Sequence, residues 1–258
     1  MLHLIAFAFL AFGSIAYGGV LPRGLVPVSN GRIYGGKEAK LGQFPYQASM
    51  RYFGLHRCGA SIYRHDAVLL AAHCTHELPA DLMEIAMGTI YRNRGGEERW
   101  IRLIIQHKDF DPETYKNDIA IIIMERSVDF SDTIQPIPLA SIGEDLKAGT
   151  LATVTGWGIM NDEGHLPDIF HYVKIRIVDH AECVQVYKDL NPVEDHMLCA
   201  GEPEGGKDAC DGDSGGPLVV ENKLYGIVSW GDDCAKPGVP GVYTSVAAFR
   251  SWIKSQYE

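Results

Sequence analysis

Short apolar runs separated by turn residues occupy most of this chain. Runs of four to seven residues, rich in aliphatic and β-branched side chains and bounded by Gly, Pro, Asn or Asp, predict strands rather than helices. The expected strands are Ala67–Ala72, Trp100–Gln106, Ile119–Met124, Leu151–Thr155, Tyr172–Val178, Pro217–Val220 and Leu224–Trp230. Such a series predicts an all-β fold, either a barrel or a sandwich.

The C-terminus has a different pattern. Val246, Phe249, Trp252 and Ile253 recur at intervals that place them on one face of a helix. We therefore expect a C-terminal helix that docks on the β structure by this apolar face.

The N-terminus has the character of a targeting segment. Leu4 to Phe12 is apolar and is followed by the small residues Gly13, Ser14 and Ala16. The run is shorter than the roughly 20 residues that span a bilayer, and it fits the core of a signal peptide. The alternative is a buried N-terminal strand or helix. We expect residues 1–18 to be the signal peptide, cleaved after Ala16 or Gly18, and the protein to be secreted and extracellular.

A Pro- and Gly-containing stretch, residues 19–32, follows and ends in Arg32, and 226 residues remain after it. That length suffices for one large or two small β domains. The formal net charge is −10, and it becomes −12 without residues 1–32, which carry two arginines and no acid. This charge disfavours nucleic acid and anionic membranes as partners and can attract basic substrates, or it serves solubility alone.

Six cysteines are present, an even number that indicates disulfides in a secreted chain and allows 15 pairings. A zinc site at His73, Cys74 and His76 is the alternative, but neither a CxxC nor an HExxH spacing accompanies it. We therefore expect no metal and no cofactor.

Three motifs carry the chemistry. Gly212-Asp213-Ser214-Gly215-Gly216-Pro217 offers a nucleophile in a tight turn, and Ala71-Ala72-His73-Cys74 and Asn117-Asp118-Ile119-Ala120 precede it. Each alone could be an ordinary turn. The chain order His, Asp, Ser belongs to one of the convergent forms of the Ser-His-Asp triad. With these motifs, the sequence resembles a trypsin-like serine protease of the chymotrypsin fold from Ile33 to the C-terminus.

The resemblance implies a protease domain over residues 33–258, built as two packed six-stranded Greek-key β-barrels with a C-terminal α-helix. The active site would lie between the barrels, and the Gln135–Leu139 segment would connect them. The implied disulfides are Cys58–Cys74, Cys183–Cys199 and Cys210–Cys234.

The resemblance also implies catalytic roles. Ser214 would be the nucleophile, His73 the general base and then acid, and Asp118 the group that fixes the imidazole tautomer. The backbone N–H groups of Gly212 and Ser214 would form the oxyanion hole. Ser229 would hydrogen-bond Asp118, and the Ser229-Trp230-Gly231 stretch would pair with an extended peptide substrate.

Asp208 matches the position at the base of the primary specificity pocket of trypsins, where a buried carboxylate needs a cationic partner. Gly231 and Gly241 match wall positions that leave room for a long side chain. The expected substrates are therefore proteins or peptides with Arg or Lys at the cleavage site. Ala209 replaces the serine of many trypsins, which removes a hydrogen-bond partner for lysine, so we expect arginine to be preferred.

The stretch Arg32-Ile33-Tyr34-Gly35-Gly36 resembles the family's activation site, which makes residues 19–32 an activation propeptide. Cleavage after Arg32 would free the amine of Ile33 to pair with Asp213 and so order the pocket. Ser49 and His56 match positions that hold the same aspartate in the inactive precursor. An enzyme that cuts after arginine is expected to activate itself.

Several positions depart from the family's pattern. Thr89 replaces the glutamate that begins the loop of calcium-binding trypsins, and Glu97 and Glu98 alone are too few ligands, so no structural calcium is expected. Tyr115 would narrow the neighbouring subsite. Extra acidic residues are expected around the pocket mouth, namely Asp211, Asp232 and Asp233. They either favour substrates with basic residues on both sides of the cleaved bond or are simply solvated.

Two competing functions remain from the sequence. One is a catalytically silent homologue that binds partners, against which the complete triad argues. The other is an enzyme of chymotrypsin or elastase specificity, against which Asp208 argues. The expected protein is a monomer, with protein protease inhibitors as further partners.

Overall fold

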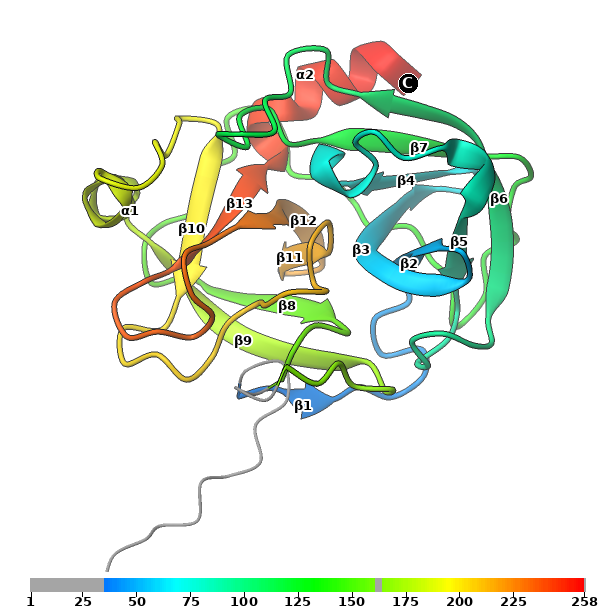
Figure 1. The fold of residues 1–258 in the computed structure, drawn as a ribbon, viewed down its shortest axis with the longest axis horizontal. Coiled ribbons are helices and arrows are strands. Elements are labelled where there is room, and N and C mark those ends of the chain that lie inside the picture. Colours follow the sequence, from blue (N-terminus) through cyan, green and yellow to red (C-terminus); the bar gives the residue numbers. More distant parts are fainter. Residues whose placement is uncertain (1–34, 161–163, 258) are drawn as a thin grey trace, which may run out of the picture.

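The computed structural model describes residues 35–160 and 164–257. They form two closed six-stranded antiparallel β-barrels that lie side by side (Figure 1), as the resemblance implies. The expected signal peptide and propeptide, with Arg32, Ile33 and Tyr34, lie outside the described residues.

The first barrel closes in the order β2-β3-β4-β7-β6-β5. Its strands are β2 (Gln47–Tyr52), β3 (Leu55–Arg64), β4 (Ala67–Leu70), β5 (Met83–Met87), β6 (Glu97–Gln106) and β7 (Ala120–Met124). β4 and β7 are apolar at every position because both of their faces are buried, the inner one in the barrel and the outer one by other elements. Their pairing brings Leu69 opposite Ile121.

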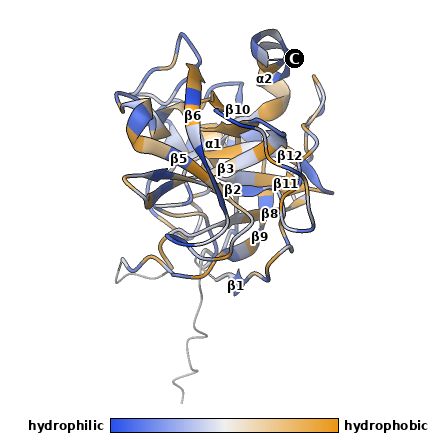
Figure 2. Cartoon of the chain, turned by 90° about the vertical axis from the view of Figure 1, so that its right-hand side faces the viewer, coloured by the Kyte–Doolittle hydropathy of each residue, from blue (hydrophilic) through white to orange (hydrophobic). Residues whose placement is uncertain are grey.

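The second barrel consists of β8 (Leu151–Gly156), β9 (His171–Val178), β10 (Met197–Gly201), β11 (Pro217–Val220), β12 (Lys223–Trp230) and β13 (Gly241–Ser245), and β1 (Lys37–Glu38) pairs with β9. β9 shows the alternation of a half-buried strand, since Val173 and Ile175 are buried while Lys174 and Arg176 are exposed. In Figure 2 hydrophobic colour gathers along the barrel strands and hydrophilic colour in the connecting loops.

The predicted C-terminal helix is present as α2 (Val246–Tyr257). Val246, Phe249 and Ile253 are buried in one hydrophobic cluster with the first barrel's core and with Leu224 and Ile227 of β12, so the helix contacts both barrels. A further helix, α1 (His180–Tyr187), was not predicted. Neither helix is long and apolar enough to cross a membrane, as judged over the described residues.

Two short 3-10 turns complete the fold, η1 (Ala72–Cys74) and η2 (Ala80–Leu82). The strand expected over Ala67–Ala72 is therefore too long. It ends at Leu70, because the chain turns there into η1, which carries His73.

The segment Gln135–Leu139 connects the barrels as expected. On the side of the first barrel, the N–H groups of Gln135 and Ile137 donate to the carbonyls of Pro45 and Ile62. On the side of the second barrel, Leu139 forms a β-bridge with Leu224 of β12. The structure also contains the three implied disulfides, Cys58–Cys74, Cys183–Cys199 and Cys210–Cys234. Each disulfide lies within one barrel, so among these features it is the Gln135–Leu139 segment and α2 that connect the barrels.

Candidate active site

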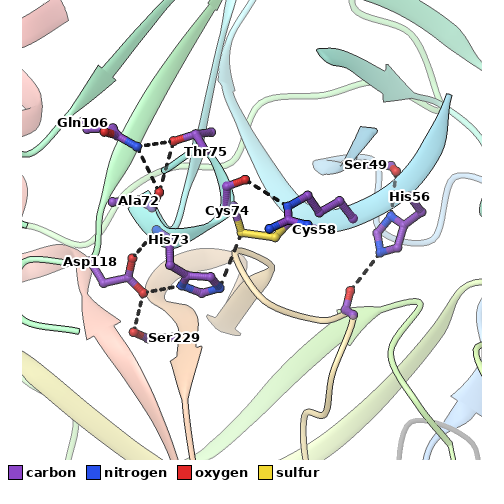
Figure 3. Close-up of a disulfide and its surroundings, with 12 residues drawn as sticks. Ser49, His56, Cys58, Ala72, His73, Cys74, Thr75, Gln106, Asp118 and Ser229 are labelled. Atoms are coloured by element: carbon purple, nitrogen blue, oxygen red, sulfur yellow. Dashed lines mark hydrogen bonds and ion pairs between the residues drawn. A yellow bond between two sulfur atoms is a disulfide. The ribbon is translucent and has the colours of Figure 1, made fainter. Parts of the chain in front are cut away.

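His73 and Asp118 meet at the end of the first barrel (Figure 3). The Nδ1–H of His73 donates to Oδ2 of Asp118 at 2.7 Å, and the backbone N–H of His73 donates to Oδ1 at 2.8 Å. Ser229, from β12 of the second barrel, donates its hydroxyl to Oδ2 at 2.6 Å. Asp118 is completely buried. Its carboxylate therefore accepts three hydrogen bonds from the protein. The bond to His73 holds the imidazole in the tautomer with its proton on Nδ1.

The backbone before Asp118 is held in an uncommon conformation. Tyr115 and Asn117 have φ values of 56° and 57°, in the left-handed region that few non-glycine residues adopt. The second barrel restrains this turn, because Thr244 donates its hydroxyl to the Asp118 carbonyl and His196 Nε2 accepts from the Asn117 N–H. The ring of Tyr115 packs edge-on against His73, beside the cavity that it was expected to narrow.

Ser214 lies in the turn before β11 and lines a cavity together with His73. Among the described residues no hydrogen bond joins Ser214 to His73, whose Nε2 lies 3.7 Å from the sulfur of Cys74. Catalytic hydrogen bonds are often long in free enzymes and shorten once a substrate is bound. The structure thus brings the three expected triad residues to one place and leaves the Ser214 hydroxyl beside the cavity.

The turn before Ser214 requires glycine. Gly212 has a φ of 96°, and a Cβ there would come within 2.8 Å of a Leu166 methyl group and 3.1 Å of Gly158 Cα. The next residue, Asp213, is buried, and its two carboxylate oxygens accept from the N–H groups of Gly158 and Cys210. Burial raises the pKa of Asp213 to about 7. Among the described residues the Asp213 carboxyl group accepts only from neutral amides, so it has no counter-charge there.

Ser49 and His56 do not reach Asp213 in this structure. They bond to each other, and His56 bonds to the carbonyl oxygen of Gly212 at 2.8 Å. In this structure His56 thus contacts the carbonyl of Gly212, the residue before Asp213, and not the Asp213 side chain that it was expected to hold in an inactive precursor.

A cavity of about 210 Å³ opens beside Ser214. Every residue that the sequence assigned to substrate binding lines it: Asp208, Ala209, Ser229, Trp230, Gly231 and Gly241. The acidic residues expected at its mouth line it as well: Asp211, Asp232 and Asp233.

Asp208 is the buried charge of this cavity, with 3% of its surface exposed. Its oxygens accept from the N–H groups of Ala209 at 2.8 Å and Ala235 at 3.0 Å. Burial raises the pKa of Asp208 to about 7, partly offset by the two amide bonds. A Cβ at Gly241 would lie 3.1 Å from Oδ1 of Asp208, so a larger residue there would obstruct the carboxylate.

Two residues of the site were missed from the sequence. Tyr243 lines the cavity, is fully buried, and its hydroxyl has no hydrogen-bond partner among the described residues. Tyr187 of α1 packs edge-on against Trp230 and donates its hydroxyl to the Pro240 carbonyl. Neither tyrosine lies in a motif, and only the fold brings them to the pocket.

The metal alternatives find little support in the geometry. Cys74 is in a disulfide, which removes the thiolate that a zinc site at His73 and Cys74 would need. Glu97 and Glu98, the acids considered for calcium, each pair with an arginine at 2.6 Å, Glu97 with Arg99 and Glu98 with the buried Arg51.

Comparison with known proteins gives a consistent result. The family model described as Trypsin matches residues 33–253. A vitellin-degrading protease of Bombyx mori is 40% identical over 227 residues, 88% of this chain and 86% of the relative. Trypsin beta of Drosophila erecta is 40% identical over 90% of this chain and 91% of its own length, and trypsin alpha-4 of Lucilia cuprina is 38% identical over 91% of each.

Proposed function

The chain belongs to the trypsin family of serine proteases, and from this premise we propose that it is a secreted endopeptidase, made as a zymogen, that cleaves after arginine and lysine. The family implies protein substrates and hydrolysis of peptide bonds. The observation that carries the specificity is the buried carboxyl group of Asp208 in the cavity that Ser214 also lines.

The reaction follows from the positions of the three triad residues. Ser214 Oγ transfers its proton to His73 Nε2 as it attacks the substrate carbonyl, and the N–H groups of Gly212 and Ser214 bind the resulting oxyanion. The imidazolium, stabilised by Asp118, then gives the proton to the leaving amine, and the C–N bond breaks. Water attacks the acyl-enzyme by the same proton transfers and frees the acid product and Ser214.

The cavity provides for a long cationic side chain. A guanidinium or ammonium group would supply the partner that the Asp208 carboxylate lacks, because its two bonds come from neutral amides. The unpartnered hydroxyl of Tyr243 adds a second polar contact in the same cavity. Ala209 offers no hydroxyl, so a bidentate guanidinium gains more here than an ammonium group does.

The acidic residues at the cavity mouth extend this preference. Asp211, Asp232 and Asp233 attract basic residues on either side of the cleaved bond. We expect the protein to act as a monomer and to be inhibited by protein protease inhibitors that present an arginine or lysine.

Activation would follow cleavage after Arg32. The free amine of Ile33 would pair with Asp213, whose buried carboxyl group has only amide donors among the described residues. Gly156 and Gly158 leave the space around it, since a Cβ at either would come within 2.2 Å of an Asp213 oxygen. Because the enzyme cuts after arginine, it would activate itself, and a Ser214→Ala precursor should remain uncut when incubated alone.

The test is amidase activity on matched peptide substrates with Arg, Lys or Phe at the cleavage site. The protein is first cleaved after Arg32, and Ser214→Ala serves as the control. The expected order of kcat/KM is Arg, then Lys, then Phe, with no activity in the control. A folded and correctly cleaved protein without activity would instead support a silent homologue that binds partners. Preferential cleavage after Phe would overturn the role of Asp208.

A further inference from the structure

A serine–histidine pair of the first barrel, with Ser49 buried and His56 partly buried, contacts the turn at Gly212 in the second barrel (Figure 3). We propose that Ser49 and His56 form a positioning relay that holds Gly212 in the conformation needed to bind the oxyanion. The proposal rests on the proposed hydrolytic function, and it gives these two residues a role in the active enzyme.

The contacts of the pair run across the junction of the two barrels. Ser49 Oγ lies 2.7 Å from His56 Nδ1, and His56 Nε2 lies 2.8 Å from the Gly212 carbonyl oxygen. Ser49 is completely buried in β2, and the imidazole of His56 packs against the Trp157 ring at 5.2 Å. Neither ring nitrogen of His56 therefore depends on solvent for its partner.

The direction of each hydrogen bond follows from the chemistry of the groups. A carbonyl oxygen only accepts, so the Gly212 contact requires a proton on His56 Nε2. Burial, with a smaller contribution from Arg92 and Arg51, lowers the pKa of His56 to about 4, so the imidazole is neutral at pH 7 and carries a single proton. Nδ1 must then accept from the Ser49 hydroxyl. Ser49 thus selects the tautomer that can bond to Gly212.

The bond matters because Gly212 has unusual backbone freedom. Its N–H is one of the two expected oxyanion donors, while its carbonyl belongs to the next peptide group, and the two share one α-carbon with a φ of 96°. A restraint on the carbonyl limits rotation about this α-carbon and so keeps the N–H directed at the oxyanion. On the other side, the Gly59 N–H of β3 donates to the Ser214 carbonyl at 2.8 Å. The first barrel thus holds both ends of the turn.

The experiment compares Ser49→Ala and His56→Phe, which keeps the ring but offers no donor to Gly212, with the cleaved wild-type enzyme, and Ser49→Thr is the variant that restores a hydroxyl. Ser61→Ala is the matched control, because Ser61 is equally buried in the same barrel and its hydroxyl has no partner among the described residues. Two inhibitors separate the effects. Benzamidine contacts only the Asp208 pocket, whereas a peptidyl-arginine aldehyde adds Ser214 Oγ to its carbonyl and places the new oxygen at the oxyanion hole.

Loss of a whole oxyanion donor costs about 10²–10³ in kcat, so a displaced donor should cost less, about 10-fold. We expect both relay variants to lose about 10-fold in kcat and in aldehyde affinity, with KM and benzamidine affinity unchanged and with recovery in Ser49→Thr. Equal losses for the two inhibitors, losses also in Ser61→Ala, or unchanged kcat would overturn the relay. A wild-type enzyme with no activity would overturn the proposed function as well.

Discussion

Asp118 and Asp208 are both buried beside the candidate active site, yet the protein surrounds them differently. Asp118 receives three donors, two from His73 and one from Ser229, at 2.6–2.8 Å. Asp208 receives two backbone amides, and burial raises its pKa to about 7. The first carboxylate is fully partnered by the protein and can hold a neighbouring imidazole. The second is left short of a counter-charge, which a substrate can supply.

The two carboxylates also differ in which barrel supplies their hydrogen-bond donors. Asp118 precedes β7 of the first barrel, and Asp208 lies in the loop before β11 of the second. The polar framework around Asp118 crosses between the barrels through Ser229 and Thr244, whereas both amide donors of Asp208 come from its own barrel. In the proposed function, catalysis would therefore depend on how the barrels are placed, and the preference for a cationic side chain would depend on one barrel alone.

The largest expected effect comes from removing the charge of the fully partnered carboxylate. In Asp118→Asn the amide would donate to His73 Nδ1, so the imidazole would carry its proton on Nε2 and could not accept one from Ser214. We expect kcat on an arginine amide to fall by about 10⁴-fold at pH 8. Asp129→Asn, at an exposed acid of the same barrel, should leave kcat unchanged. A loss below tenfold would contradict the triad assignment.

The next effect is expected at the carboxylate that lacks a counter-charge. Asp208→Asn leaves the substrate's cation unpaired in a buried cavity, which costs about 3–5 kcal/mol, or roughly 10²–10³-fold or more in kcat/KM for arginine substrates. Activity on a matched phenylalanine substrate should change little, because that side chain makes no ion pair. If the arginine and phenylalanine activities fell together, Asp208 would be a structural group and not a specificity group.

The pH dependence of cation binding tests whether Asp208 lacks a counter-charge in the empty pocket. Benzamidine binds the ionised form of Asp208, so its binding lowers the pKa of this group from about 7 and releases a proton. Affinity should be constant above pH 8 and fall about tenfold for each unit below pH 7. Calorimetry on the cleaved Ser214→Ala protein measures both the affinity and the proton release. A constant affinity down to pH 5 would show that Asp208 is already ionised in the empty pocket.

The smallest predicted effect concerns the neighbour of Asp208. Ala209→Ser adds a hydroxyl to the pocket lining, and one hydrogen bond to an ammonium group contributes about 1 kcal/mol. The ratio of kcat/KM for arginine over lysine should fall about fivefold from its wild-type value. The comparison uses matched tripeptide amides at saturating and limiting concentrations. Equal ratios in the two proteins would leave the arginine preference without this explanation.

The strands that the sequence predicted have aliphatic runs or the alternation of a half-buried strand, whereas the missed strands β2 and β3 contain buried polar residues. β2 alternates the polar residues Gln47, Ser49 and Arg51 with apolar ones, but it contains no long aliphatic run and buries its polar side chains as well. These side chains are buried because partners elsewhere in the fold satisfy them, as Thr155 does for Gln47. Such partners are distant in the chain, and no local pattern reports them.

The missed helix α1 had a local signal. Asp179 caps its first turn by accepting from the N–H groups of Ala181 and Glu182, an N-cap aspartate with glutamate at the third helical position. Its weak amphipathic pattern concealed it, because few of its residues, among them Cys183 and Tyr187, are buried. The disulfide of Cys183 and the packing of Tyr187 on Trp230 hold it in place.

The sequence by itself determined which chemical groups are present and in what order, because a nucleophile, a base and an acid can be recognised in short motifs. It also determined the β class and the C-terminal helix, because hydrophobic periodicity is a local property. Only the tertiary structure decided how the groups are partnered. His56 contacts the Gly212 carbonyl, 156 residues away in the chain, and Thr155 donates to Gln47, 108 residues away, each through a single hydrogen bond. Such interactions depend on the distances between two barrels, and those distances are set by packing over the whole molecule.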